Sequence, residues 1–260
     1  MTEATHDALI LDQFTRQARP FSTAATISNE AALQMIVEAA RPGPDDAVLD
    51  VACGPGLVLC AFAPYVRQAT GIDMTPAMLD RARQLAAAKG LGNIAFHQGD
   101  VYALPWDDAS FAIVVTRFSV HHFLEPAKVL REMARVCAPG GRILVIDDYA
   151  TDDPDKSAAF NRLEKLRDPS HVRCLSLAEL QALFGAAGLP APRTTLYDMR
   201  DTVRSLLARS FPNPGDDVKI IEMFRASAED DRLGIPVRLD GEAIHYAYPV
   251  AILAADCPPR

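Results

Sequence analysis

The segment 48–58, VLDVACGPGLV, constrains the fold of this chain more than any other. It reads as a buried strand that carries an acid, Asp50, near its end, followed by a turn that contains Gly54 and Gly56. A strand, a tight glycine turn and a helix bring backbone N–H groups close to a ligand. Asp73 lies at the end of the next predicted strand, where a carboxylate can accept hydrogen bonds from both hydroxyls of a ribose. The pattern therefore predicts an adenosine-type ligand.

Short β-branched runs alternate with helical patterns, which is typical of a parallel sheet with helices on both faces. The predicted strands cover residues 47–52, 69–73, 94–98, 111–117, 142–148, 193–198 and 245–255. Two helices are expected before the first strand, over 6–19 and 28–41, and two more at about 202–210 and 216–230. We predict an α/β fold with one doubly wound domain over residues 1–260, made of an N-terminal helical lid (1–44), a cofactor-binding core (45–150) and a helical cap insert (200–244) between the sixth and seventh strands.

Composition limits the classes of partner. The 260 residues carry a formal net charge of −8, whereas broad contact with nucleic acid needs a basic face, so we expect no nucleic-acid partner. No apolar run approaches the ~20 residues that span a membrane. Five scattered cysteines without a CxxC pair predict reduced thiols, a cytoplasmic location and no metal site. The expected partner is a small-molecule substrate, and the sequence leaves both a monomer and a homodimer open.

The charges around the glycine turn distinguish between two cofactors. The nicotinamide fingerprint is GxGxxG, but the third glycine position, counted from Gly54, is Leu59. Asp50 precedes the turn, where a carboxylate disfavours a diphosphate and suits an ammonium group. S-adenosylmethionine has a ribose, a sulfonium and a free amino-acid end, and no phosphate. The charge pattern favours this cofactor, with a nicotinamide dinucleotide as the alternative.

Four motifs in order, VLDVACGPG, GIDMT, GDVYALPWDDASFAIVVT and LREMARVCAPGGRILVID, resemble those of the class I S-adenosylmethionine-dependent methyltransferases. The chain looks most like the group that includes ubiquinone and menaquinone C-methyltransferases and bacterial small-molecule methyltransferases. The resemblance covers about residues 45–150. It implies a Rossmann-like, seven-stranded, mostly parallel sheet with strand order 3-2-1-4-5-7-6 and an antiparallel last strand.

The resemblance also implies which residues bind the cofactor. Asp50 would favour the ammonium group, Asp73 would bind the ribose, and Met74 would pack on the adenine. The full set is Asp50, Ala52, Cys53, Gly54 and Gly56 at the methionine end, Asp73 and Met74 at the ribose and adenine, Gly99, Asp100 and Val101 at the adenine edge, and Thr116 and Arg117 near the sulfonium.

Methyl transfer requires the acceptor to be aligned and water to be excluded, and it needs a base only if the acceptor has a proton to lose. His121 and His122, just past the fourth strand, are the catalytic candidates. A histidine near its ordinary pKa could deprotonate a phenol, enol or amine. The alternative is that these histidines cap or pack the following helix.

Two further groups are candidates for the lid and the substrate site. Phe14, Arg19 and Phe21 are expected in a lid over the cofactor, with a frayed terminus as the alternative. Asp148 and Tyr149 end the fifth strand and could bind a cationic or hydroxylated acceptor, with a solvated turn as the alternative.

We therefore predict transfer of a methyl group from S-adenosylmethionine to a small-molecule acceptor. One alternative keeps the cofactor but changes the reaction to intramolecular cyclisation or aminocarboxypropyl transfer, and methylthioadenosine as product would reveal it. Another alternative is a non-catalytic cofactor-binding partner. The sequence leaves open which acceptor atom is methylated.

Overall fold

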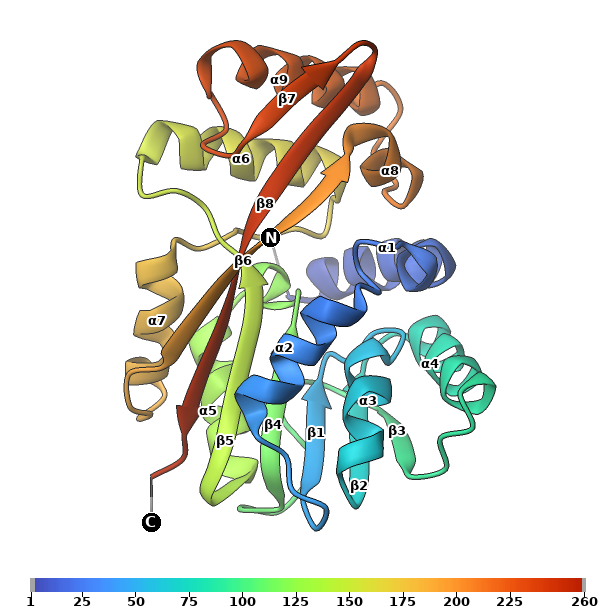
Figure 1. Ribbon diagram of the computed structural model, residues 1–260, viewed down its shortest axis with the longest axis vertical. Helices are drawn as coiled ribbons and strands as arrows, with labels where there is room; N and C mark the ends of the chain where they lie inside the picture. Colours follow the sequence, from blue (N-terminus) through green and yellow to red (C-terminus); the bar gives the residue numbers. More distant parts are fainter. Residues whose placement is uncertain (1–2, 259–260) are drawn as a thin grey trace.

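Eight strands of the computed structural model form one sheet, and the structure describes residues 3–258 (Figure 1). The strands are β1 Ala47–Val51, β2 Gln68–Asp73, β3 Ile94–Gln98, β4 Phe111–Arg117, β5 Cys137–Asp148, β6 Arg193–Thr202, β7 Val237–Asp240 and β8 Ala243–Asp256. The α-helices are α1 Glu3–Thr23, α2 Glu30–Ala40, α3 Leu57–Phe62, α4 Pro76–Ala88, α5 Pro126–Val136, α6 Pro154–Arg167, α7 Leu177–Ala186, α8 Val203–Ala208 and α9 Asp216–Asp230, and the 3₁₀ helices are η1 Ala63–Tyr65 and η2 Val120–His122.

The sheet has the order β3-β2-β1-β4-β5-β8-β6, and β7 pairs with the far part of β8. The first five strands are parallel, whereas β8 runs antiparallel to both β5 and β6. This is the order implied by the resemblance, with β8 as the seventh strand of that scheme. The predicted Rossmann-like methyltransferase fold is confirmed.

Two apolar layers cover the faces of the sheet, as continuous apolar runs such as β4 require. On one face, Ile113 of β4 packs in the same cluster as Ile36 of α2 and Leu59 of α3. On the other face, Val114 of the same strand packs with Leu130 of α5 and with α7 residues. Successive side chains of a strand point to opposite faces, so one short run of sequence supports both layers.

A cap stands above the carboxyl ends of the parallel strands, at the top of Figure 1. It consists of α6, α8, α9, β7 and the extended ends of β6 and β8. The Phe160 and Tyr248 rings join α6 to β8, with centroids 5.1 Å apart, and the Phe224 and Tyr246 rings join α9 to β8, with centroids 5.2 Å apart. The two helices predicted in the insert are present as α8 and α9.

The structure extends several predicted elements and adds others, among them the helices α6 and α7 and the strand β7. β7 was not predicted; it forms a hairpin with β8 through the turn at Gly241, whose φ is 57°. β6 reaches Thr202, because it pairs with β8 as far as His245. β5 begins at Cys137, so the PGG turn after α5 lies within this strand. Among residues 3–258, no helix is both long and apolar enough to cross a membrane.

Candidate active site

A cavity of about 410 Å³ lies at the carboxyl ends of β1, β2 and β4, and residues of α1 line it. This is the edge where open α/β sheets bind ligands. Figure 1 shows α1 above these strands. Ten of the twelve predicted cofactor residues line it: Asp50, Ala52, Cys53, Gly54, Asp73, Met74, Gly99, Asp100, Val101 and Arg117. The structure therefore brings together, around one cavity, residues that follow four different strands of the sheet or lie at their ends.

The turn after β1 has a backbone that few residues can adopt. Gly54 and Gly56 have φ of 50° and 77°, in the left-handed region that favours glycine. Ala52 in the same turn, with φ of 58°, and Phe118 directly after β4, with φ of 54°, also have left-handed backbone although each has a Cβ atom. Both line the cavity. Such strain costs of order 1–3 kcal/mol per residue and concentrates at functional sites.

Asp73 holds the turn from the neighbouring strand. Its Oδ2 accepts a hydrogen bond from Gly54 N at 2.9 Å, and its Oδ1 accepts one from Thr75 N at 2.8 Å. Burial raises the Asp73 pKa, and these two hydrogen bonds partly oppose the shift. Each carboxylate oxygen still has a second lone-pair site, so both can also accept ribose hydroxyls.

Asp50 is the second acid of the cavity and is 1% exposed. Its pKa is raised well above the usual value by burial and then by the nearby Asp73, and the Arg117 charge lowers it only in part. A positively charged ligand group would stabilise the ionised form of Asp50. The cavity thus suits the ammonium or sulfonium charge of S-adenosylmethionine.

Two predicted cofactor residues lie outside the cavity lining. Gly56 allows close packing instead: a Cβ there would lie 3.0 Å from the Cβ of Ala82. Thr116 is fully buried, and its Oγ1 donates to the backbone O of Val51 at 2.7 Å and shares a hydrogen bond with Ser119. Both residues shape the walls of the site without facing it.

The N-terminal helix α1 covers the cavity, as expected of a lid, and Phe14 and Phe21 line it. Arg19 is exposed and does not line it. Several hydrogen bonds hold α1 in place. Within α1, His6 Nε2 donates to the backbone O of His122 at 2.7 Å and Gln17 Nε2 donates to Asp168 Oδ2 at 2.9 Å, while Arg81 Nε donates to Ser22 Oγ at 2.7 Å. In this structure α1 is docked rather than frayed.

The two candidate histidines are adjacent but have opposite electrostatic environments. Burial favours neutral His121, but Asp147 and Asp148 outweigh it and raise the His121 pKa well above the usual value. Its Nδ1 lies 2.6 Å from Asp147 Oδ1 and 3.3 Å from Asp148 Oδ1. Burial and the positive charge of His121 lower the His122 pKa to about 3. The expectation of a histidine near its ordinary pKa is therefore wrong for both.

The predicted substrate residues Asp148 and Tyr149 do not line the cofactor cavity. Asp148 is buried rather than part of a solvated turn, and its Oδ2 accepts a hydrogen bond from Cys174 Sγ at 3.1 Å. Tyr149 is partly buried, and its backbone N donates to Pro249 O. Asp148 therefore supports His121, and Tyr149 joins β5 to β8.

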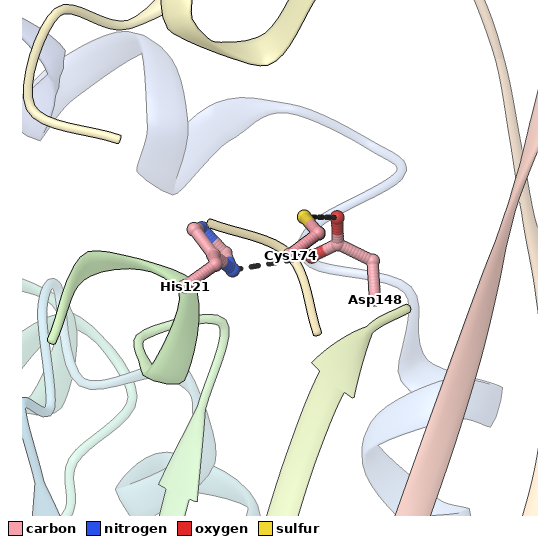
Figure 2. A group of neighbouring side chains, drawn as sticks. All are labelled: His121, Asp148 and Cys174. Atoms are coloured by element: carbon pink, nitrogen blue, oxygen red, sulfur yellow. Dashed lines mark hydrogen bonds and ion pairs between the residues drawn. The ribbon is translucent and has the colours of Figure 1, made fainter. Parts of the chain in front are cut away.

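His121, Asp148 and Cys174 point toward one another (Figure 2). Within residues 3–258 they are the only three such side chains found with potential metal-ligand atoms all within 4.8 Å of one another. Each of the three already has a hydrogen-bond partner: His121 Nδ1 bonds to Asp147 Oδ1, and Cys174 Sγ donates to Asp148 Oδ2. These bonds account for the geometry of the cluster, and the absence of a metal site stays a prediction.

A second, smaller cavity of about 50 Å³ adjoins the first. His122, Phe14, Phe21 and Phe118 line both cavities, which places them at the shared wall. The small cavity is otherwise lined by residues of α1, β6, the cap and the loop that follows α6. His121 and Asp148, both predicted site residues, line this second cavity.

Sequence reasoning missed the partners of His122. Ser170 Oγ lies 3.3 Å from His122 Nδ1 and 2.5 Å from Asp168 Oδ1. The backbone N atoms of Val172 and Arg173 donate to the backbone O of His121 at 2.9 and 3.1 Å, which fixes this loop against η2. The only signal in the sequence is the concentration of Asp, Ser and His in the run 168–171, DPSH.

Known proteins are similar to this chain in sequence and in fold. Residues 49–145 match a family described as a methyltransferase domain. The chain is 39% identical over 235 residues to the uncharacterized methyltransferase YcgJ of Bacillus subtilis, covering 90% of this chain and 93% of the relative. The crystal structure of YcgJ aligns with a TM-score of 0.82 at 31% identity, over 88% of this chain and 99% of that one.

Two relatives with named acceptors match the chain over shorter stretches. A demethylmenaquinone methyltransferase of Deinococcus radiodurans is 45% identical over 103 residues, which are 38% of this chain and 42% of the relative. Ajmaline N-methyltransferase of Rauvolfia serpentina is 32% identical over 144 residues, 51% of this chain and 50% of the relative. Sequence, fold and cavity agree, and this chain belongs to the class I S-adenosylmethionine-dependent methyltransferases.

Proposed function

We propose that the acceptor of this enzyme is a small organic molecule whose reacting group enters the small cavity beside the cofactor cavity. The observation that carries this proposal is the position of the small cavity, which shares a wall with the cofactor cavity and lies between α1, the ends of β4 and β5, and the cap. Its volume of about 50 Å³ has room for roughly three to five water-sized groups. Relatives that match part of the chain are named a demethylmenaquinone methyltransferase and an ajmaline N-methyltransferase, which supports an organic acceptor of which only the reacting group enters this cavity.

We also propose how the chain holds the cofactor. Asp73 accepts the ribose hydroxyls, Asp50 attracts the ammonium group, and Asp100 and Val101 contact the adenine. The two buried acids in one cavity support this orientation, because they would repel a diphosphate. When bound, S-adenosylmethionine supplies an electrophilic methyl carbon on a sulfonium.

The chain itself aligns the reactants and excludes water. Docked α1 covers part of both cavities, with Phe14 and Phe21 at their shared wall. Exclusion of water and alignment of the acceptor with the methyl group are the main contributions a methyltransferase can make. A cytoplasmic location belongs to the proposal, since Cys53, Cys60 and Cys174 are buried thiols.

Calorimetric titration tests the cofactor assignment. S-adenosylmethionine and S-adenosylhomocysteine should bind, and reduced nicotinamide dinucleotide should not. Asp50→Asn should weaken both ligands by a similar factor, because both carry the ammonium group; weakening of S-adenosylmethionine alone would place Asp50 at the sulfonium instead. Mass spectrometry after incubation with candidate acceptors should detect S-adenosylhomocysteine. Methylthioadenosine as the main product would instead indicate use of the sulfonium without methyl transfer.

A further inference from the structure

We propose that the acceptor is an uncharged molecule with a hydroxyl group, and that His122 Nε2 accepts the hydrogen bond from this hydroxyl and takes up its proton. This inference rests on the proposed function and extends it to the chemical class of the acceptor. It assigns His122 as the catalytic residue of the pair and His121 as a positioning residue.

The location of the His122 ring is the first observation. The ring contributes to the wall between the cofactor cavity and the small cavity. It is buried, with 6% of the residue exposed, and the edge of the Phe14 ring packs against it with centroids 5.0 Å apart. His121 lines only the small cavity, and its Nδ1 forms a hydrogen bond with Asp147. Of the two histidines, only His122 can face both reactants.

The hydrogen bonds of Ser170 determine which nitrogen of His122 carries the proton. Asp168 accepts from Ser170 Oγ at 2.5 Å, from Ser170 N at 2.9 Å and from Gln17 Nε2 at 2.9 Å. An ionised carboxylate can only accept, so the single hydroxyl proton of Ser170 points to Asp168. Ser170 Oγ must then accept from His122 Nδ1–H. Neutral His122 is therefore the Nδ1–H tautomer, and its Nε2 has a lone pair to offer an acceptor.

The electrostatics of the pair keep His122 in this neutral form. His121 with its two carboxylates carries the positive charge, and burial together with that charge lowers the His122 pKa to about 3. Asp168 and a hydrogen bond to the Ser170 backbone raise the His122 pKa and Arg167 lowers it, without reversing the shift. Nε2 is thus an acceptor at any pH at which the protein is commonly handled.

The charges around the small cavity indicate the class of acceptor. Glu164 bonds to Arg167 and to the Tyr248 hydroxyl, at 2.5 and 2.6 Å. Arg209 Nη1 lies 2.6 Å from Asp201 Oδ2. Asp148 and Asp168 have the partners given above, so each charged side chain lining this cavity is already satisfied within the described part of the chain. A charged acceptor would lose hydration there without gaining a counter-ion.

The reaction is balanced in protons and charge. The acceptor oxygen forms a bond to the methyl carbon, the carbon–sulfur bond breaks, and its electron pair stays on sulfur. The hydroxyl proton passes to His122 Nε2. The sulfonium charge disappears in the same step in which the imidazolium charge appears, so the total charge of the joined cavities is unchanged. The proton leaves His122 for water when the product departs.

Histidine NMR tests the tautomer without any turnover. In ¹⁵N-histidine-labelled protein we expect the His122 signals of a neutral Nδ1–H ring from about pH 5 to about pH 8. Ser170→Ala should produce a mixture of tautomers, while affinity for S-adenosylhomocysteine is retained. An Nε2–H tautomer in the unmodified protein, or titration of His122 near its ordinary pKa, would overturn the proposal.

Three probes of similar size test the acceptor class in the complex with S-adenosylhomocysteine. Phenol should shift the His122 Nε2 resonance. Benzene, which lacks the hydroxyl, should not shift it, and benzoate, which carries a charge, should bind more weakly than phenol. The proposed acceptor class would be refuted if benzoate bound more strongly than phenol, or if phenol and benzene shifted the Nε2 resonance equally. Failure of the protein to bind S-adenosylhomocysteine at all would instead contradict the proposed function.

Two variants of His122 form a matched pair. His122→Asn keeps an amide near the Nδ1 position but has no atom at the Nε2 position, so kcat with a hydroxyl acceptor should fall by about 10²- to 10⁴-fold. His122→Gln places an amide oxygen near the Nε2 position and should bind phenol like the unmodified protein. Since neither amide can take up the proton, kcat should fall in both variants. Equal phenol binding in the two variants, or a kcat that is unchanged in either of them, would show that Nε2 does not have the proposed role.

Discussion

Asp73→Asn tests how the acid at the end of β2 contributes to cofactor affinity. In the structure each carboxylate oxygen already accepts one backbone N–H, from Gly54 and from Thr75, and keeps one lone-pair site for a ribose hydroxyl. Asparagine offers a single, neutral acceptor and turns an N–H₂ donor toward one of the backbone donors. We expect affinity for S-adenosylmethionine to fall by about 1–3 kcal/mol, or about 5- to 150-fold in Kd, because hydrogen bonds to a charged group are lost.

Calorimetry on the folded variant measures this change, with circular dichroism to confirm the fold. Asp80→Asn is the matched control, since Asp80 lies on α4, its side chain is 69% exposed and its partner is Arg83. The control should bind the cofactor like the unmodified protein. A folded Asp73→Asn protein whose Kd changes by less than about twofold would refute the ribose assignment, because even one neutral hydrogen bond contributes about 1 kcal/mol.

Further perturbations test the packing and electrostatics of the site. Gly71→Ala should destabilise the protein by about 1–3 kcal/mol, because the added Cβ would lie 2.6 Å from a neighbouring side-chain carbon, whereas Gly92→Ala, with open space around it, should be close to neutral in thermal denaturation. The pKa of His122 is about 3 in the folded protein and 6.5 in its ordinary state. Between these two pH values the unfolded chain binds a proton on His122 and the folded protein does not. The free energy of unfolding therefore falls by about 1 kcal/mol for each unit by which the pH decreases in this range. Urea denaturation at about pH 6.5 and about pH 4.5 measures this change. Between these pH values the free energy of unfolding should decrease less for His122→Asn than for the unmodified protein, and an equal or larger decrease would contradict the lowered His122 pKa. Arg209→Met should cost about 1–3 kcal/mol, since the Asp201 carboxylate loses its charged partner and keeps only the hydrogen bonds from Thr26, Thr202 N and Ser205. Adding Asp201→Asn should restore part of this stability, and no recovery would show that the ion pair is not the cause.

The sequence by itself determined the sheet and the cofactor edge. Strands and helices follow from local periodicity, and the glycine turn and Asp73 are placed by the strands that carry them, because parallel strands end at one edge. These features need only neighbours close in the chain. For this reason ten of the twelve predicted cofactor residues line one cavity.

Tertiary structure decided the roles of the polar side chains. Asp147 reaches His121 across 26 residues, and Ser170 reaches His122 across 48, so these contacts exist only once β5, α6 and the following loop have packed. Thr116 faces a neighbouring strand and not the cavity for the same reason. A pKa depends on burial and on charges within a few ångströms, and these distances are fixed by the packed fold rather than by the order of residues along the chain.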